Sequence, residues 1–235
     1  MKTMDIFKKE FNEALLVSDL HYSSKHAMLN ELIEWLSTRS EKTVFMLGDM
    51  VGKEKDLGYF IKRIEQETNQ KNFIMIRGNH DKWWKYPHPQ IEDSSCIELS
   101  PYLNGYYKIG GKLVMLGHGH AADRNCPIPL DKYCPRLKNY LEATKKWKIN
   151  VIKSAPWLKD KWCIFGHNHR IYLNKKLRVA STGSWRYKYY LDRVLRRKPD
   201  FGYALLIKRK NNKNPQDDEF SVSILDARKS IKLAQ

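Results

Sequence analysis

Five short motifs rich in Asp, Asn and His recur along this chain, and each follows directly on an apolar run. In chain order they are Asp19-Leu20-His21, Gly48-Asp49, Gly78-Asn79-His80-Asp81, Gly117-His118-Gly119-His120 and Gly166-His167-Asn168-His169. Carboxylate oxygens and neutral imidazole nitrogens are common ligands of divalent transition metals, and an amide oxygen can complete such a shell without adding charge. The motifs hold too many ligands for one tetrahedral ion. Two ions about 3.5–4 Å apart, bridged by one carboxylate, would use them all.

The apolar runs before the motifs predict where these ligands meet. Runs at 14–18, 43–47 and 72–76 alternate with amphipathic helices expected over 24–37 and 56–69. This alternation predicts parallel strands joined by crossover helices. Because ligands bind beyond the carboxyl ends of the strands in such sheets, the motifs are expected to gather at one sheet edge.

The second half of the chain has a different pattern, with short strands separated by turn residues. These strands are expected at 106–109, 113–116, 162–165, 171–173, 177–180, 203–207 and 220–224. Gly110-Gly111 predicts a hairpin turn. Residues 121–161 carry a proline-broken stretch and a helix expected over 136–147, which we interpret as a cap over the sheet edge. No repeat or long linker divides the sequence, so we expect one domain over 1–235 that includes this cap insertion.

The net charge of the chain indicates which kind of partner it binds. Its net charge is +17 at pH 7, which favours an anionic partner such as nucleic acid or a nucleotide. A solvated lysine-rich face is the alternative explanation. No apolar run is long enough to predict a transmembrane segment, and the N-terminus lacks a secretory apolar region. We therefore expect a cytoplasmic protein, and its oligomeric state stays open.

The five motifs, in this order, resemble those of the calcineurin-like metallophosphoesterases, from about Asp19 to Trp185. The resemblance implies an α/β fold, a four-layer α/β/β/α sandwich with a dinuclear metal site at one edge of its sheets. It implies two ligand sets with one bridging carboxylate: Asp19, His21 and His169 in the first set, Asn79, His118 and His167 in the second, and Asp49 as the bridge. It also implies that His80 is the catalytic histidine and binds no metal.

The reaction expected from this resemblance is hydrolysis of a phosphodiester or pyrophosphate bond. A metal-bridging hydroxide would attack, and His80 would assist the leaving group. The cofactors would be two divalent transition-metal ions, with Mn²⁺ favoured and Fe, Zn, Ni or Co as alternatives. The substrate would be an anionic phosphate ester. The alternative functions are a phosphomonoesterase and a non-catalytic binding or scaffold protein on the same fold.

The chain departs from the family pattern at Gly52. Many relatives carry a second Asp there, which orients the catalytic histidine, and Asp81 is the remaining candidate for that role. Around the last motif the chain resembles the UDP-2,3-diacylglucosamine hydrolases. A basic stretch with interleaved tyrosines follows, over 170–198. We name Arg170 and Arg186 from it, together with His120, as candidate substrate-binding residues.

Overall fold

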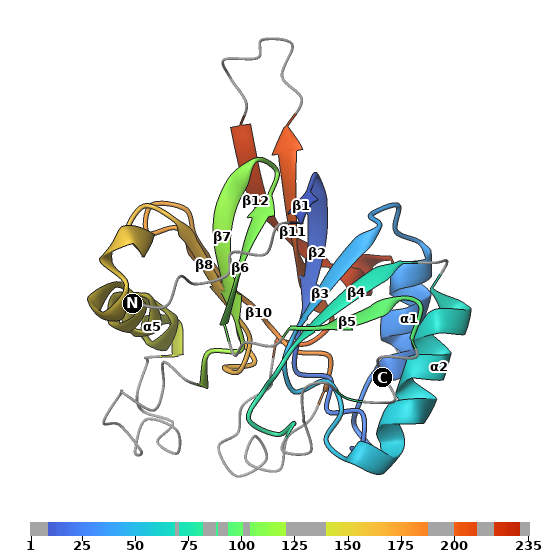
Figure 1. The fold of residues 1–235 in the computed structure, drawn as a ribbon. Coiled ribbons are helices and arrows are strands. Elements are labelled where there is room, and N and C mark those ends of the chain that lie inside the picture. The colour runs from blue at the N-terminus through green and yellow to red at the C-terminus, as the bar shows by residue number, and fades with distance from the viewer. Residues whose placement is uncertain are drawn as a thin grey trace.

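Two six-stranded sheets lie face to face, and helices cover their outer faces (Figure 1). The computed structural model describes residues 9–68, 71–81, 88, 94–100, 104–120, 140–187, 200–210 and 219–230. Three apolar clusters separate four layers. One lies between the first sheet and α1 and α2, one between the two sheets, and one between the second sheet and α5. The expected α/β/β/α sandwich is therefore confirmed.

The first sheet has the strand order β12-β11-β2-β3-β4-β5. Its strands are β2 (Glu13–Val17), β3 (Thr43–Leu47), β4 (Asn72–Ile76), β5 (Ile97–Leu99), β11 (Tyr203–Lys210) and β12 (Glu219–Asp226). β2, β3, β4 and β5 run parallel. The helix α1 (Leu29–Ser37) provides the crossover from β2 to β3, and α2 (Leu57–Glu67) provides the crossover from β3 to β4. The runs in β2, β3 and β4 are buried on both faces, as continuous apolar strands of parallel sheets usually are.

The second sheet has the order β1-β6-β7-β8-β10-β9. Its strands are β1 (Glu10–Phe11), β6 (Asn104–Ile109), β7 (Lys112–Gly117), β8 (Trp162–Phe165), β9 (Ile171–Asn174) and β10 (Val179–Thr182). β6 and β7 form the expected hairpin, and Gly110 and Gly111 turn it with φ of 56° and 76°. The outer face packs against α5 (Tyr140–Ser154) and the short helix η2 (Pro156–Leu158). Two further 3₁₀ turns are η1 (Glu54–Asp56) and η4 (Ala227–Lys229).

The two largest differences from the expected helix boundaries are at the start of α1 and at the end of α5. α1 begins at Leu29 and not at residue 24, because the preceding residues are held against the segment 185–187. Ala27 forms a bridge with Arg186, and the Met28 N–H donates to the Trp185 carbonyl. The helix expected over 136–147 continues to Ser154, while residues 136–139 lie outside the described part.

Only part of the predicted cap lies within the described residues. Its described portion, 140–161, contains α5 and η2, which form a layer against the second sheet. Residues 121–139 lie outside the described residues. A cap over 121–161 and a single domain over 1–235 therefore stay predictions.

Both sheets direct their motif-bearing strand ends to one edge. β7 and β8 are parallel, and β2, β3 and β4 are parallel. A hydrogen bond at 2.7 Å between His118 Nδ1 and the Leu47 carbonyl joins the ends of β7 and β3. Another, at 2.9 Å from the His167 N–H to Asp19 Oδ2, joins the ends of β8 and β2. The five motifs thus meet across the two sheets.

Candidate metal centre

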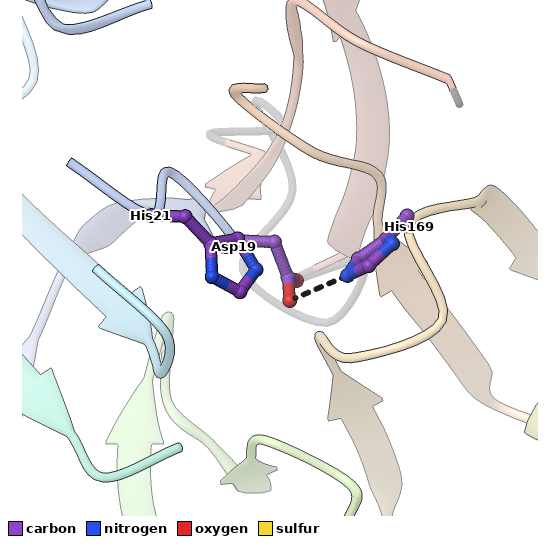
Figure 2. Close-up of side chains that lie close together, drawn as sticks. All are labelled: Asp19, His21 and His169. Atoms are coloured by element: carbon purple, nitrogen blue, oxygen red, sulfur yellow. Dashed lines mark ion pairs between the residues drawn. The ribbon is translucent and has the colours of Figure 1, made fainter. Parts of the chain in front are cut away.

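Asp19, His21 and His169 form the first ligand cluster (Figure 2). Asp19 and His21 lie on the turn after β2, and His169 lies after β8. One ligand atom from each side chain lies within 4.8 Å of the other two. His169 Nε2 is 3.3 Å from Asp19 Oδ1, and both Asp19 and His21 are buried. A carboxylate and two imidazoles in this arrangement fit a divalent transition metal.

Asp49, His118 and His167 form the second cluster, again with ligand atoms within 4.8 Å of one another. Three polar atoms surround His118 Nε2: Asp49 Oδ2 at 3.2 Å, His167 Nδ1 at 3.2 Å and Asn79 Oδ1 at 3.0 Å. His118 Nδ1 faces a carbonyl oxygen, to which only a protonated nitrogen can donate. This contact fixes the tautomer that directs the Nε2 lone pair into the cluster.

The Asp49 carboxylate lies between the two clusters. Its Oδ2 is 3.2 Å from His118 Nε2 in the second cluster and 3.8 Å from His21 Nε2 in the first. The side chain is almost wholly buried. A single carboxylate in this position can be shared by two cations.

The backbone of the ligand turns is strained. Five residues of the two clusters have left-handed φ: Asp19 at 57°, His21 at 50°, Asp49 at 54°, His167 at 69° and His169 at 54°. This region is costly for residues with a Cβ and is associated with functional sites. The tight turns direct these side chains back across the strand ends.

The Gly78–Asp81 motif is built around Asp49. A Cβ on Gly78 would lie 2.1 Å from Asp49 Oδ1, so only glycine allows this approach. The His80 N–H donates to Asp49 Oδ1 at 2.8 Å. Asp81 Oδ2 accepts from the Gly78 N–H at 2.8 Å and from the Asp49 N–H at 2.9 Å. Asp81 thereby holds the backbone of the motif and of the Asp49 turn.

His80 is exposed, while its neighbour Asp81 is fully buried. The His80 ring lies 5.1 Å from the His21 ring, between centroids. The imidazole is therefore beside the first cluster and open to solvent, where a substrate would approach. Asp81 had been the candidate for orienting this ring, but among the described residues its hydrogen bonds go to backbone N–H groups.

A second set of residues braces Asp19. The Ser18 hydroxyl bonds Asp19 Oδ2 and lies 2.6 Å from Thr182 Oγ1. The Ser184 hydroxyl donates to the Asp19 carbonyl at 3.0 Å, and the Trp185 N–H donates to the same carbonyl at 3.3 Å. The Gly183-Ser184-Trp185 tripeptide is not among the site residues expected from the sequence. Its bracing contact spans 165 residues of sequence, which no local pattern could reveal.

The charges of the clusters are strongly coupled. Burial lowers the pKa of His21 to about 3, so this ring is neutral and ready to bind a cation. Burial also opposes ionisation of Asp19 and Asp49, but the neighbouring histidines lower both pKa values below their ordinary range. Burial disfavours a charged His118, yet the Asp49 carboxylate raises its pKa to about 9. Burial, followed by the charge of Asp49, raises the pKa of Asp81 to about 7.

The structure places the three candidate substrate residues differently. The His120 ring lies 5.5 Å from the His118 ring and 6.4 Å from the His167 ring, between centroids. Arg170 follows the last ligand and its guanidinium is 3.5 Å from Asp200 Oδ1. Arg186 lies on the segment that braces Asp19 and pairs with Ala27. His120 is thus brought to the second cluster. The two arginines belong to segments that adjoin the first cluster, Arg170 next to His169 in the chain and Arg186 next to Trp185, whose N–H donates to the Asp19 carbonyl.

A family model described as calcineurin-like phosphoesterase matches residues 14–205 of this chain. The chain therefore belongs to the calcineurin-like phosphoesterase family. It is a metal-dependent hydrolase of phosphoesters, and the expectation of an enzyme is confirmed. No curated protein matches the sequence. Within the described residues, no helix is both long and apolar enough to span a bilayer.

Solved structures with a similar fold have low sequence identity to this chain. A conserved uncharacterized protein and predicted phosphoesterase from Streptococcus pneumoniae TIGR4 is 14% identical, with a TM-score of 0.48; the match covers 92% of this chain and 90% of that one. The phosphoesterase YfcE from E. coli is 13% identical, with a TM-score of 0.46 and coverages of 92% and 99%. The Pseudomonas putida nuclease MPE is 14% identical, with a TM-score of 0.41 and coverages of 74% and 73%. At these identities and TM-scores, none of the three structures indicates the substrate of this chain.

Proposed function

We propose that this protein is a dinuclear phosphoesterase that hydrolyses a phosphodiester or pyrophosphate bond. The observation that carries the proposal is the position of Asp49 Oδ2, 3.2 Å from His118 in one cluster and 3.8 Å from His21 in the other. Asp19, His21 and His169 would hold one cation, and His118, His167 and Asn79 would hold the second. Asp49 would bridge them.

Two divalent cations held there would supply Lewis acidity, which neutralises phosphate oxygens and lowers the pKa of a water molecule. Mn²⁺ suits this mixture of oxygen and nitrogen donors, and Fe, Zn, Ni and Co suit it as well. The protein's own part is to fix the donors. The tautomer of His118 is set by the Leu47 carbonyl, and the Asp19 carboxylate is held by Ser18 and by the His167 N–H.

His80 is the proposed catalytic residue. Its exposed ring stands beside the first cluster, while its backbone N–H is bonded to Asp49. As an imidazolium it would donate a proton to the leaving oxygen of the ester. The hydrogen bond through the backbone holds residue 80 in place and leaves the side chain available to the substrate.

Nucleic acid or a nucleotide is the proposed substrate class. The net charge of +17 supports an anionic ligand. Arg170 and Arg186, on segments that adjoin the first cluster, would contact phosphates beyond the scissile one. Each such contact adds an affinity that falls as salt concentration rises.

The test compares hydrolysis of bis-p-nitrophenyl phosphate with that of p-nitrophenyl phosphate in Mn²⁺, with His80→Ala as the control. A preference for the diester, with a lower rate in the variant, supports the proposal. A preference for the monoester would make the protein a phosphomonoesterase. With polynucleotide substrates, KM should rise steeply between low and moderate salt, and a flat salt profile would exclude this substrate class.

A further inference from the structure

Trp147 joins the helical layer to the ligand turns. It lies on α5, outside all five motifs, and is 2% exposed. Its ring centroid is 5.8 Å from that of His167, with the two planes inclined by 40°. It also packs edge-on against Phe165 at 5.6 Å. One side chain from an outer helix thus reaches a proposed metal ligand across the end of β8.

The same indole lies against the second ligand turn, His118-Gly119-His120. A Cβ built on Gly119 would lie 2.9 Å from Trp147 Cζ3, and Gly119 has a φ of 101°. The turn can therefore approach the indole this closely only because residue 119 is glycine. Trp147 contacts both turns that supply imidazoles to the Asp49/His118/His167 cluster, hereafter the second centre.

Packing of this kind determines how well ligands are placed. A metal ligand binds strongly when its ring orientation is fixed by surrounding groups, and the apolar surroundings also control water access. His167 has a left-handed backbone with a φ of 69°, and its ring packs against the Trp147 indole. Trp147 is rigid, large and almost wholly buried among Met115, Phe165 and Leu158.

We propose that Trp147 is a positioning residue that makes the metal affinity of the second centre depend on α5. This inference rests on the proposed function, because it requires that the second centre holds a cation. It predicts that a substitution of Trp147 lowers the affinity for one of the two ions and leaves the affinity for the other unchanged.

The first experiment measures Mn²⁺ binding to the purified full-length chain by equilibrium dialysis. Wild-type protein should bind two ions. Trp147→Leu should bind one ion with wild-type affinity and the other about 10-fold more weakly. Trp147→Phe, which keeps an aromatic ring, should recover most of that affinity. Val179→Ala is the matched control, because Val179 belongs to the same buried cluster on β10. It should lower stability and leave both affinities unchanged.

The second experiment uses the indole as a reporter and does not require the leucine variant to fold. A paramagnetic ion such as Co²⁺ quenches tryptophan fluorescence most strongly at short range. Trp147→Phe should remove the part of the Co²⁺-dependent quenching that comes from an ion in the second centre. Quenching by an ion in the first cluster should remain, because Trp185 lies there and its N–H donates to the Asp19 carbonyl. Trp157→Phe should preserve both parts of the quenching, because Trp157 lies 44% exposed on η2, against Tyr106.

The outcomes separate the two proposals. If wild-type protein binds fewer than two ions, the dinuclear proposal fails. If wild-type protein binds two ions and Trp147→Leu binds both with unchanged affinity, only the role of Trp147 is overturned. The role of Trp147 would also be overturned if Val179→Ala lost as much Mn²⁺ affinity as Trp147→Leu. It would likewise be overturned if Co²⁺ quenched Trp147→Phe as strongly as it quenches the wild type.

Discussion

The His80 N–H donates a hydrogen bond to Asp49 Oδ1 at 2.8 Å. The contact uses the backbone of His80 and leaves its imidazole free to face the solvent side of the clusters. It means that the catalytic and the ligand-holding functions of this motif can be changed separately.

His80→Ala should therefore keep its metals and lose turnover. The variant retains the N–H that supports Asp49, but it lacks the imidazole that we propose protonates the leaving group. We expect kcat to fall by about 10²–10⁴-fold. Metal content after dialysis, measured by atomic emission alongside the steady-state rate, checks this. Loss of metal from the variant would show that His80 is a ligand.

Asp49→Asn should abolish turnover through the opposite route. The amide keeps the shape of the side chain, but it removes the charge shared by the two clusters. Asp49→Asn should bind both ions far more weakly or not at all, whereas His167→Ala should lose only one ion. Glu98→Gln is a matched control, because that carboxylate pairs with Lys9 at the surface. Wild-type metal content in Asp49→Asn would contradict the bridging role.

Metal binding should release a proton near neutral pH. The Asp49 carboxylate raises the pKa of His118 to about 9, so in the metal-free protein this ring is charged at pH 7.5 and must lose its proton to bind an ion. Apparent Mn²⁺ affinity should rise about tenfold per pH unit toward pH 9 and then level off. Indicator-dye measurement of proton release on adding Mn²⁺ checks this. An affinity that is flat between pH 7 and 9 would refute it.

Asp81→Asn should change how stability depends on pH. Burial raises the folded-state pKa of Asp81 to about 7, above its ordinary value of 3.8. The stability that the protonated Asp81 carboxyl contributes is therefore fully present below pH 3.8. It is lost as the pH rises to about 7. Relative to the variant, the free energy of unfolding of the metal-free wild type should fall by about 1.4 kcal/mol per pH unit in this window.

Urea unfolding at pH 4.5, 6.0 and 7.5 provides the measurement. The asparagine oxygen can still accept from the Gly78 and Asp49 N–H groups, so the variant should fold. Parallel pH dependences of the two proteins would mean that the Asp81 carboxyl does not titrate as its burial indicates. Asp81→Leu, which removes the acceptor, should be less stable than Asp81→Asn at every pH.

The sequence predicted the elements that carry the site more accurately than the elements around them. β3, β4 and β8 have the expected bounds, because apolar runs buried on both faces end sharply at polar motifs. β5, with three residues, and β1, with two, were not expected, because strands so short have no pattern of their own. The start of α1 was wrong because Ala27 and Met28 pair with a segment near residue 185.

Within the site, the gathering of the motifs at one edge could be predicted from the alternation of strands and helices, because the carboxyl ends of parallel strands share an edge. The supporting contacts could not. Trp147 lies on an amphipathic helix, where a buried aromatic residue normally signals only core packing. Its contact with His167 depends on how α5 sits on the second sheet, and helical spacing carries no information about that placement.

The left-handed turns at the ligands have a consequence for how this protein can change. Each costs about 1 kcal/mol or more of folding free energy, which the buried layers must offset. A lineage that no longer needed the reaction would gain stability by placing glycine at positions such as His21 or His169. The residues that serve the proposed reaction therefore lower the folding stability at this edge of the sheets. Selection for thermal stability alone would favour replacing them.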